Sequence, residues 1–222
     1  MKRTKLHDRD LPQYSRGEEI ANMVTHIVGG AFSVIALALC LAKALPQGPL
    51  TFSAAFLYGC SAIVLYTMSS VYHGLPRGSA KKVLQILDHC TIYALIAGTY
   101  TPIVLCALAP KYPAVGWGLC AAEWILAITA AALTAIDLRK YKVVSMVCYI
   151  GMGWGIIIFL PQITDVLPAA GFGWLLAGGI AYTIGAVLFG LGKRMKWMHS
   201  LFHIFVVLGS VLQFLTIFFY VF

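Results

Sequence analysis

The sequence predicts an all-α membrane protein, a bundle of seven transmembrane helices. Hydrophobic residues make up 60% of the 222 residues and charged residues 11%, and the mean hydropathy is +0.86. A soluble domain is less apolar and carries about 25% charged residues. The apolar runs are long and nearly unbroken, whereas the strands of a membrane β-barrel would read as short alternating segments. Helical spans are therefore expected, in a single domain without a linker.

Residues 1–19 form a polar, basic leader, which we expect to lie in the cytoplasm ahead of the membrane domain, residues 20–222. The leader contains Asp8, Asp10, Glu18 and Glu19 among its bases, and it stays polar for too long to resemble a cleaved signal peptide. The first span should therefore remain in the protein.

Seven apolar runs follow, each near the ~20 residues that a hydrocarbon core of ~30 Å requires. Pro102 falls inside the third run, where we expect a kink, or a local arrangement in which groups such as Thr99 satisfy the backbone. The predicted spans are residues 20–44, 50–72, 83–107, 115–136, 143–163, 172–191 and 199–222.

Small residues inside the spans are expected to serve helix packing. Six cysteines, at positions 40, 60, 90, 106, 120 and 148, all lie in apolar runs, so we interpret them as small core residues and not as disulfides. Glycines in the fifth and sixth spans are expected at close helix contacts and not in ligand sites. These glycines are Gly151, Gly153, Gly155, Gly178 and Gly179.

The basic residues predict the orientation of the bundle, because lysine and arginine are retained on the cytoplasmic side during insertion. Fourteen of the sixteen lie in the leader and in the second, fourth and sixth loops; the other two are Lys43 and Lys111. This distribution places the N-terminus in the cytoplasm and the C-terminus outside, opposite to the G-protein-coupled receptors. Because the bases are spread over short loops and not gathered in one patch, nucleic-acid binding is not expected.

Polar groups from four spans fall at the predicted cytoplasmic ends. His199 and His203 lie four residues apart and so share one face of the last helix. His73 closes the second span, and Asp88 lies seven residues beyond Lys81, ~10 Å along the third helix at 1.5 Å per residue. Buried groups of this kind normally face the bundle interior and pair with one another or bind something.

A single metal ion explains this convergence best. We expect His73, His199 and His203 as ligands, with Asp88 as a fourth ligand or as the partner of a bound water. Three imidazoles and an oxygen suit zinc, and a fourth position filled by water is typical of a catalytic site. The main alternative is a hydrogen-bonded proton relay.

Three further polar residues are expected near this site. Ser69 shares a helical face with His73, where its hydroxyl can bond to a metal-bound water or to a substrate carbonyl; the alternative is a serine used in helix packing. Asn22 and His26 share a face of the first span, and we expect them to orient the ligands or to act as a gate. Plain interhelical hydrogen bonding is the alternative for this pair.

Two other ionisable residues fit the cluster poorly. His89 follows Asp88 directly and so points about 100° away from it, which makes it a poor co-ligand. Glu123 lies in the outer part of the fourth span, at a different depth, and the sequence indicates no partner for it.

At these residues the sequence resembles the progestin and adipoQ receptor family, specifically its bacterial haemolysin-III-like branch, over nearly the whole chain. The resemblance implies seven helices, a cytoplasmic N-terminus, a bacterial plasma (inner) membrane location and a zinc site. In that site His73, His199 and His203 would bind the ion and Asp88 would contact it through water. The wider superfamily includes alkaline ceramidases, which implies a lipid amide hydrolase. The matching motifs are Glu19-x2-Asn22-x2-Thr25-His26, Ser69-x3-His73, Asp88 and His199-x3-His203.

The first functional hypothesis is a zinc-dependent hydrolase of a lipid amide or ester at the cytoplasmic leaflet. Zinc would lower the pKa of bound water toward ~7 and polarise the scissile carbonyl, with Asp88 as general base and Ser69 bonded to the developing oxyanion. The second is a non-enzymatic membrane sensor or homeostasis protein with a structural zinc. The third is a pore or transporter, which the family's haemolysin name favours, but no span carries charges spaced along its length.

Membrane lipids are the expected partners, including the anionic inner leaflet that basic loops attract. No soluble protein partner is predicted. The substrate and the oligomeric state stay open.

Overall fold

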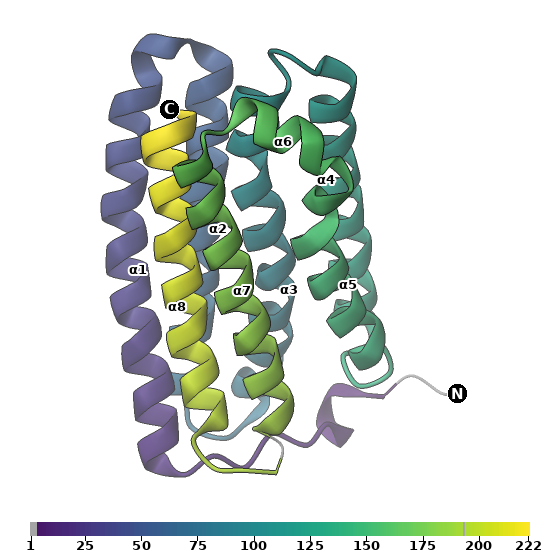
Figure 1. Ribbon diagram of the computed structural model, residues 1–222. Coiled ribbons are helices and arrows are strands. Elements are labelled where there is room, and N and C mark those ends of the chain that lie inside the picture. Colours follow the sequence, from purple (N-terminus) through teal and green to yellow (C-terminus); the bar gives the residue numbers. More distant parts are fainter. Residues whose placement is uncertain (1–3, 193) are drawn as a thin grey trace.

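The computed structural model describes residues 4–192 and 194–222, and these form one upright helical bundle (Figure 1). Within this part of the chain, seven segments are long and apolar enough to cross a membrane. The prediction of an all-α, seven-span, multi-pass membrane protein is confirmed. The segments are Arg16–Gln47, Pro49–Gly74, Ser79–Leu108, Pro113–Ile136, Lys142–Val166, Ala169–Leu191 and Met198–Val221.

The first helix, α1 (Arg16–Ala44), begins before the apolar run because Ser15 caps it. The Ser15 hydroxyl accepts a hydrogen bond from the Glu18 backbone N–H, and the Glu18 carboxylate accepts one from the Ser15 N–H at 2.9 Å. This reciprocal capping box satisfies two N–H groups that a helix start leaves free. Glu18 and Glu19 therefore lie on the first turn of α1, above the rest of the leader.

The third segment changes its helical geometry at Pro102. The helix α3 (Ser79–Pro102) is followed by a π-helical stretch, η3 (Ile103–Leu108), in which the Ala109 N–H donates to the Val104 carbonyl, five residues back. Because proline supplies no N–H for the carbonyl four residues before it, the π turn absorbs the defect. Thr99 donates to Leu95 instead, so its hydroxyl does not satisfy that carbonyl.

The fifth segment, predicted as one helix, is divided into α5 (Lys142–Trp154), a 3-10 stretch η4 (Gly155–Phe159) and α6 (Leu160–Val166). The Tyr100 hydroxyl supports the division: it donates to the Gly153 carbonyl at 3.1 Å and accepts from the Ile156 N–H at 3.0 Å. A side chain from α3 therefore satisfies backbone groups at the break.

The packing prediction for the glycines is confirmed in the sixth segment and wrong for two glycines of the fifth. A Cβ added at Gly178, in α7 (Ala169–Leu191), would lie 2.7 Å from the Gln213 side chain, so a larger residue would force that side chain to shift. A Cβ added at Gly151 or Gly153 would meet nothing within 4 Å. These two glycines are exposed, so a side chain has room there.

The remaining helices are α2 (Pro49–Gly74), α4 (Pro113–Ile136) and α8 (Met198–Thr216), which ends in the π-helical η5 (Ile217–Val221). In Figure 1, α1, α8 and α7 stand side by side on one flank, and α4 and α5 stand on the other. The central element is α3: 67% of the apolar window of the third segment is buried, against 17% for each of the fifth and sixth.

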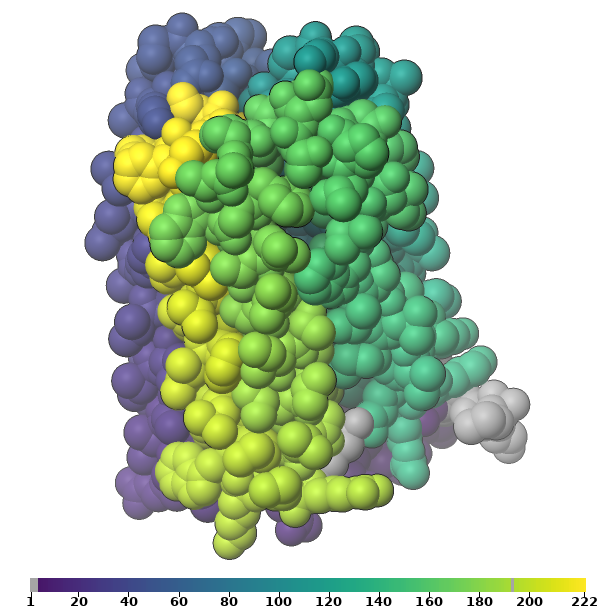
Figure 2. All heavy atoms as spheres, viewed as in Figure 1, coloured from purple at the N-terminus to yellow at the C-terminus, as the bar shows by residue number. Residues whose placement is uncertain are grey.

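The outer faces of the bundle carry large apolar side chains, as a lipid environment requires. Examples are Val28, Ile128 and Ile158, which are 59%, 67% and 78% exposed. The six cysteines are free, as predicted; Cys40 is fully buried and the others are half-buried. Figure 2 shows the surface hollowed between α7 and the α5–α6 segment.

Candidate metal centre

Three histidines from two helices meet at the end of the bundle where α1, α3, α5 and α8 begin, the lower end in Figure 1. His73 lies in the last turn of α2, and His199 and His203 lie in the first two turns of α8. Each offers one ring nitrogen, and these atoms all lie within 4.8 Å of one another. The three side chains are buried, so the site is shielded from water.

A left-handed residue fixes the start of α8. Trp197, at φ 67°, has the positive φ that non-glycine residues rarely adopt, and its backbone N–H donates to the Glu18 carboxylate at 2.7 Å. Glu18 thus links the first turn of α1 to the first turn of α8. This contact sets where His199 enters the bundle.

The donor set fits a divalent metal such as zinc. The Nε2 atoms of His199 and His203 lie 3.1 Å apart, close to the ~3.3 Å between two ligands of a tetrahedral zinc with bonds of ~2.0–2.1 Å. The Nε2 of His73 is buried with no hydrogen-bond partner among the described residues. A buried polar atom without a partner lowers the stability of the fold, so this nitrogen is expected to bind a ligand such as a metal ion.

Glu19 holds the His73 ring in place. Its Oε2 lies 2.6 Å from Nδ1 of His73, and its Oε1 lies 2.7 Å from Nζ of Lys81. A carboxylate on Nδ1 holds the proton there and leaves Nε2 as a lone pair, the arrangement found behind metal-binding histidines. Lys81, itself only 3% exposed, also donates to the carbonyls of His73 and Leu75.

No role was predicted for Glu19, although it belongs to the motif of the first span, and none was predicted for Lys81. A local signal for Glu19 was available: it lies three residues before Asn22 and seven before His26, on the same helical face. No comparable local signal pointed to Lys81, which reaches Glu19 from another helix.

The structure places Asn22 and His26 against the three histidines. Asn22 is fully buried, with Nδ2 3.4 Å from Nδ1 of His73, and its Oδ1 accepts a hydrogen bond from Ser200 at 2.7 Å. The His26 ring stacks on His203 with centroids 3.8 Å apart. Both residues therefore touch a candidate ligand, as expected from their shared face.

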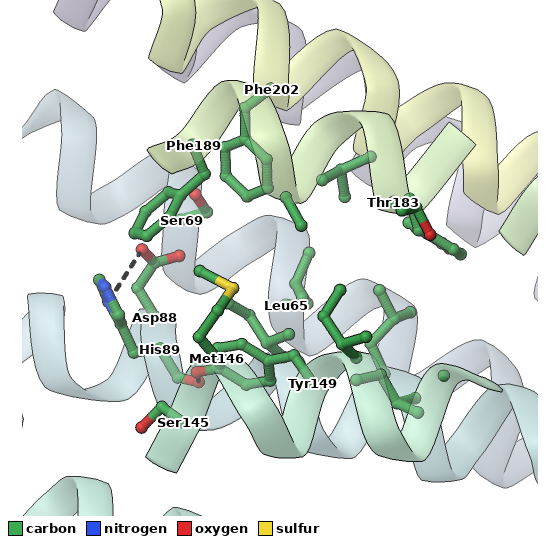
Figure 3. Close-up of a pocket in the computed structure, with 18 of the residues that line it drawn as sticks. Leu65, Ser69, Asp88, His89, Ser145, Met146, Tyr149, Thr183, Phe189 and Phe202 are labelled. Atoms are coloured by element: carbon green, nitrogen blue, oxygen red, sulfur yellow. Dashed lines mark hydrogen bonds and ion pairs between the residues drawn. The ribbon is translucent and has the colours of Figure 1, made fainter. Parts of the chain in front are cut away.

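A large cavity begins at this site and extends between α3, α5 and α7. Its volume is about 980 Å³ and its lining is mainly apolar. Figure 3 shows Asp88 and Ser69 at one end and Thr183 at the other, with Met146 and Tyr149 contributed by α5. His199 and His203 line the same cavity. The candidate metal site thus borders a space large enough for an acyl chain.

Asp88 and Ser69 keep their predicted roles as hypotheses. Asp88 lines the cavity and lies 3.8 Å from Nδ1 of His89, but within the described residues the metal group contains histidines alone. The same grouping excludes His89, whose Nδ1 lies 2.8 Å from the Gln85 carbonyl oxygen. Asp88 therefore lies outside the candidate ligand group and stays a predicted partner of a bound water.

The leader covers the site, a contact that the sequence did not predict. Tyr14 stacks on His199 with ring centroids 4.7 Å apart and an angle of 16°. Burial raises the pKa of the Tyr14 hydroxyl, and the carboxylates of Glu19 and Asp88 raise it further, so the residue is uncharged. Arg77 holds the chain in place by donating to the carbonyls of Pro12 and Leu11.

Residues 14–214 match the model of a family described as haemolysin-III related. The chain belongs to the haemolysin-III related family. It is 40% identical over 205 residues to Hemolysin-3 of Bacillus cereus, covering 92% of each chain. It is 34% identical to the Hemolysin-3 homolog of Bacillus subtilis, covering 91% of this chain and 94% of the relative. The resemblance inferred from the motifs is confirmed.

A human relative extends the haemolysin-III similarity beyond bacteria. The Monocyte to macrophage differentiation factor of Homo sapiens is 27% identical over 178 residues, which are 76% of this chain and 70% of the relative. All three histidines lie within the residues that match the family model.

Glu123 lies far from the three histidines, in α4; it is 4% exposed, and its Oε2 has no partner among the described residues.

Proposed function

We propose that this haemolysin-III family member binds zinc through His73, His199 and His203 and hydrolyses a lipid amide or ester at the cytoplasmic leaflet. One observation carries the proposal: the three-histidine group borders a cavity of about 980 Å³ that also holds a carboxylate and a hydroxyl. A structural site saturated by protein ligands and lacking a cavity would not provide this arrangement.

The number of ligands supports a site with an open position. Among the described residues the group contains three histidines and no fourth protein ligand. Structural zinc sites usually have four protein ligands, and catalytic sites usually have three. When bound, zinc supplies Lewis acidity, which polarises a carbonyl oxygen and makes water acidic near neutral pH.

The residues of the chain would perform the other steps. Hydrolysis breaks the bond from the carbonyl carbon to nitrogen or oxygen, forms a new bond from that carbon to water oxygen, and moves a water proton to the leaving group. Asp88 would take this proton from the water and then give it to the leaving group. Ser69 would donate a hydrogen bond to the carbonyl oxygen, and the apolar cavity would hold the acyl chain and exclude water.

The loop charges and the relatives support the proposed location. Arg77 and Lys82 lie at the same end of the bundle as the histidines, where they bond to the leader. Basic residues are retained in the cytoplasm, so we propose that this end faces the cytoplasm. Two relatives from Bacillus support a bacterial plasma membrane.

A second candidate is a sensor in which zinc is structural. The ligands come from two helices, and Glu19 connects a third, so a bound ion would hold α1, α2 and α8 together. This role requires the same histidines and no turnover. Both candidate functions therefore require the bound metal, and only the hydrolase requires Asp88 as a general base.

The first test is the metal content of detergent-purified protein, measured by mass spectrometry. We expect about one zinc per chain in the wild type, and loss of the metal in His73→Ala and His199→Ala. His89→Ala is the matched control, because His89 lines the cavity but lies outside the metal group. If wild-type protein neither retains nor rebinds zinc, the proton-relay alternative replaces the metal site.

The second test separates the enzyme from the sensor. Asp88→Asn should keep its zinc and lose lipid hydrolysis by about 10²-fold or more, because general acid–base catalysis contributes about 10²–10⁴-fold. Released fatty acid would be measured from a panel of ceramides and lysolipids. A variant that hydrolyses a confirmed substrate at the wild-type rate would remove Asp88 from the mechanism, and absence of turnover with zinc present would favour the sensor.

A further inference from the structure

A buried arginine of the leader has two donor atoms without a partner among the described residues. Arg9 is 7% exposed, and its Nε and Nη1 atoms are buried with no hydrogen-bond partner in the described part of the chain. The four residues outside that part are Met1, Lys2, Arg3 and Lys193, none of which has an acidic side chain. Buried charges in proteins are normally paired, so two guanidinium donors are available for an external anion.

Arg9 lines the cavity together with residues of the turn between α4 and α5. The Thr4 N–H donates to the Asp137 carboxylate in this turn at 2.7 Å and so fastens the leader there. Figure 1 shows the leader running below the bundle toward this turn. Arg9, Arg139 and Lys142 all line the large cavity. Three cations from the leader and the turn are thus presented to one space.

The acidic groups nearby do not neutralise these cations. Two carboxylates line the same cavity: Asp10, which is exposed, and Asp88, which lies 3.8 Å from Nδ1 of His89. The Asp137 carboxylate is occupied by backbone N–H groups of Thr4, Arg139 and Lys140. The cavity therefore has more positive than negative groups at this end, and the Arg9 donors remain free.

The opposite part of the cavity is apolar, with Ile157, Leu160, Phe172 and Leu176 in its lining. A cavity that is apolar along its length and lined by cations at one end matches an amphiphile with one acyl chain and an anionic headgroup. The forked donors of arginine match the geometry of phosphate oxygens.

We propose that Arg9, with Arg139 and Lys142, forms a phosphate-binding subsite that selects single-chain lipids with a phosphate headgroup. The subsite deepens the proposed function by naming a ligand class. It rests on that function in one respect, the presence of a lipid in the cavity, and it requires neither zinc nor turnover. Binding and metal content can therefore be tested separately.

The experiment measures binding of three probes to the full chain in a neutral detergent by microscale thermophoresis. The probes are oleoyl lysophosphatidate, monooleoylglycerol, which has the same chain without the phosphate, and inorganic phosphate. We expect lysophosphatidate to bind at least about tenfold more tightly than monooleoylglycerol, the size of one charge-assisted contact. If inorganic phosphate alone binds as tightly as lysophosphatidate, the ligand is free phosphate and the lipid assignment fails.

Variants of Arg9 identify the subsite. Arg9→Gln should abolish the preference for lysophosphatidate, and Arg9→Lys should retain part of it, because lysine keeps the charge without the fork. Arg16→Gln is the matched control: Arg16 is an exposed arginine on the same part of the chain and does not line the cavity. The proposal is overturned if Arg9→Gln keeps the preference, or if Arg16→Gln loses it equally, which would indicate general charge attraction.

Two further measurements make the outcome independent of folding and of the metal. If Arg9→Gln does not fold, the double variant Arg139→Gln/Lys142→Gln replaces it, since both side chains are exposed; it should weaken lysophosphatidate binding severalfold, and unchanged binding would overturn the proposal. His73→Ala should lose zinc and keep the lysophosphatidate preference. Failure of the proposed hydrolase would thus leave the phosphate subsite standing.

Discussion

The two sides of the bundle differ in how closely their helices pack. On the side of α1, α2, α3 and α8, glycines meet neighbouring side chains: a Cβ added at Gly29 would lie 2.6 Å from Tyr66, and one at Gly98 would lie 2.1 Å from Ser61. On α5, Gly151 and Gly153 face open space. The histidines belong to the tight side, and the cavity opens toward the loose side.

This difference separates two requirements of the proposed site. A metal site needs ligands held within a few tenths of an ångström, which closely packed helices provide. A lipid pocket needs space, which the cavity beside α5 provides. One bundle meets both requirements because the cavity lies along the boundary between the two sides.

The largest expected effect comes from exchanging the two kinds of glycine for alanine. Gly98→Ala should lower the free energy of unfolding by about 1–3 kcal/mol, because its new methyl group overlaps Ser61. Gly151→Ala should leave stability unchanged or raise it by up to about 1 kcal/mol, because alanine favours a helix and has room there. Unfolding in detergent against denaturant measures both. Equal destabilisation of the two variants would contradict the division into sides.

An intermediate effect is expected at the link between Glu19 and His73, 2.6 Å apart on the tight side. Glu19→Gln should weaken zinc binding about 10–100-fold, as loss of a hydrogen-bonded partner behind a metal ligand typically does. Competition with a chelator measures the zinc affinity. Asp8→Asn, which removes an exposed leader carboxylate, should have no effect. Unchanged affinity in Glu19→Gln would show that the contact does not orient His73.

The smallest expected effect lies where the leader meets the loose side. The pKa of the Asp137 carboxyl is lowered from 3.8 to about 2, first by the Thr4 N–H and then by those of Lys140 and Arg139. A lowered pKa means that the ionised group stabilises the folded state above about pH 4 and loses this contribution as the pH falls through 2.

Asp137→Asn should therefore cost about 1 kcal/mol at pH 7, the value of a typical hydrogen bond. It should also flatten the decline in melting temperature that is expected of the wild type between pH 4 and pH 2. Melting curves of both proteins over this range provide the measurement. Parallel curves would show that the carboxylate does not anchor the leader.

Local features of the sequence determined the number of spans and the histidine pair. Each span is a continuous apolar run whose length is set by the bilayer, so it can be recognised without its neighbours. The same holds for His199 and His203, whose shared face follows from the helical repeat. The convergence of His73 with them was predicted from equal depths at one membrane face, and the structure brings the three rings together.

Tertiary structure alone decided the contacts between segments distant in sequence. Glu19 and His73 are 54 residues apart, and Glu18 and Trp197 are 179 apart, so no local periodicity reveals either pair. The leader reads as a solvated tail because its residues are polar, yet Tyr14 lies on His199. The break in the fifth segment likewise depends on Tyr100 from α3. The local sequence determines the length of each helix and which residues share a helical face. Which side chains meet across helices depends on how all seven helices pack together.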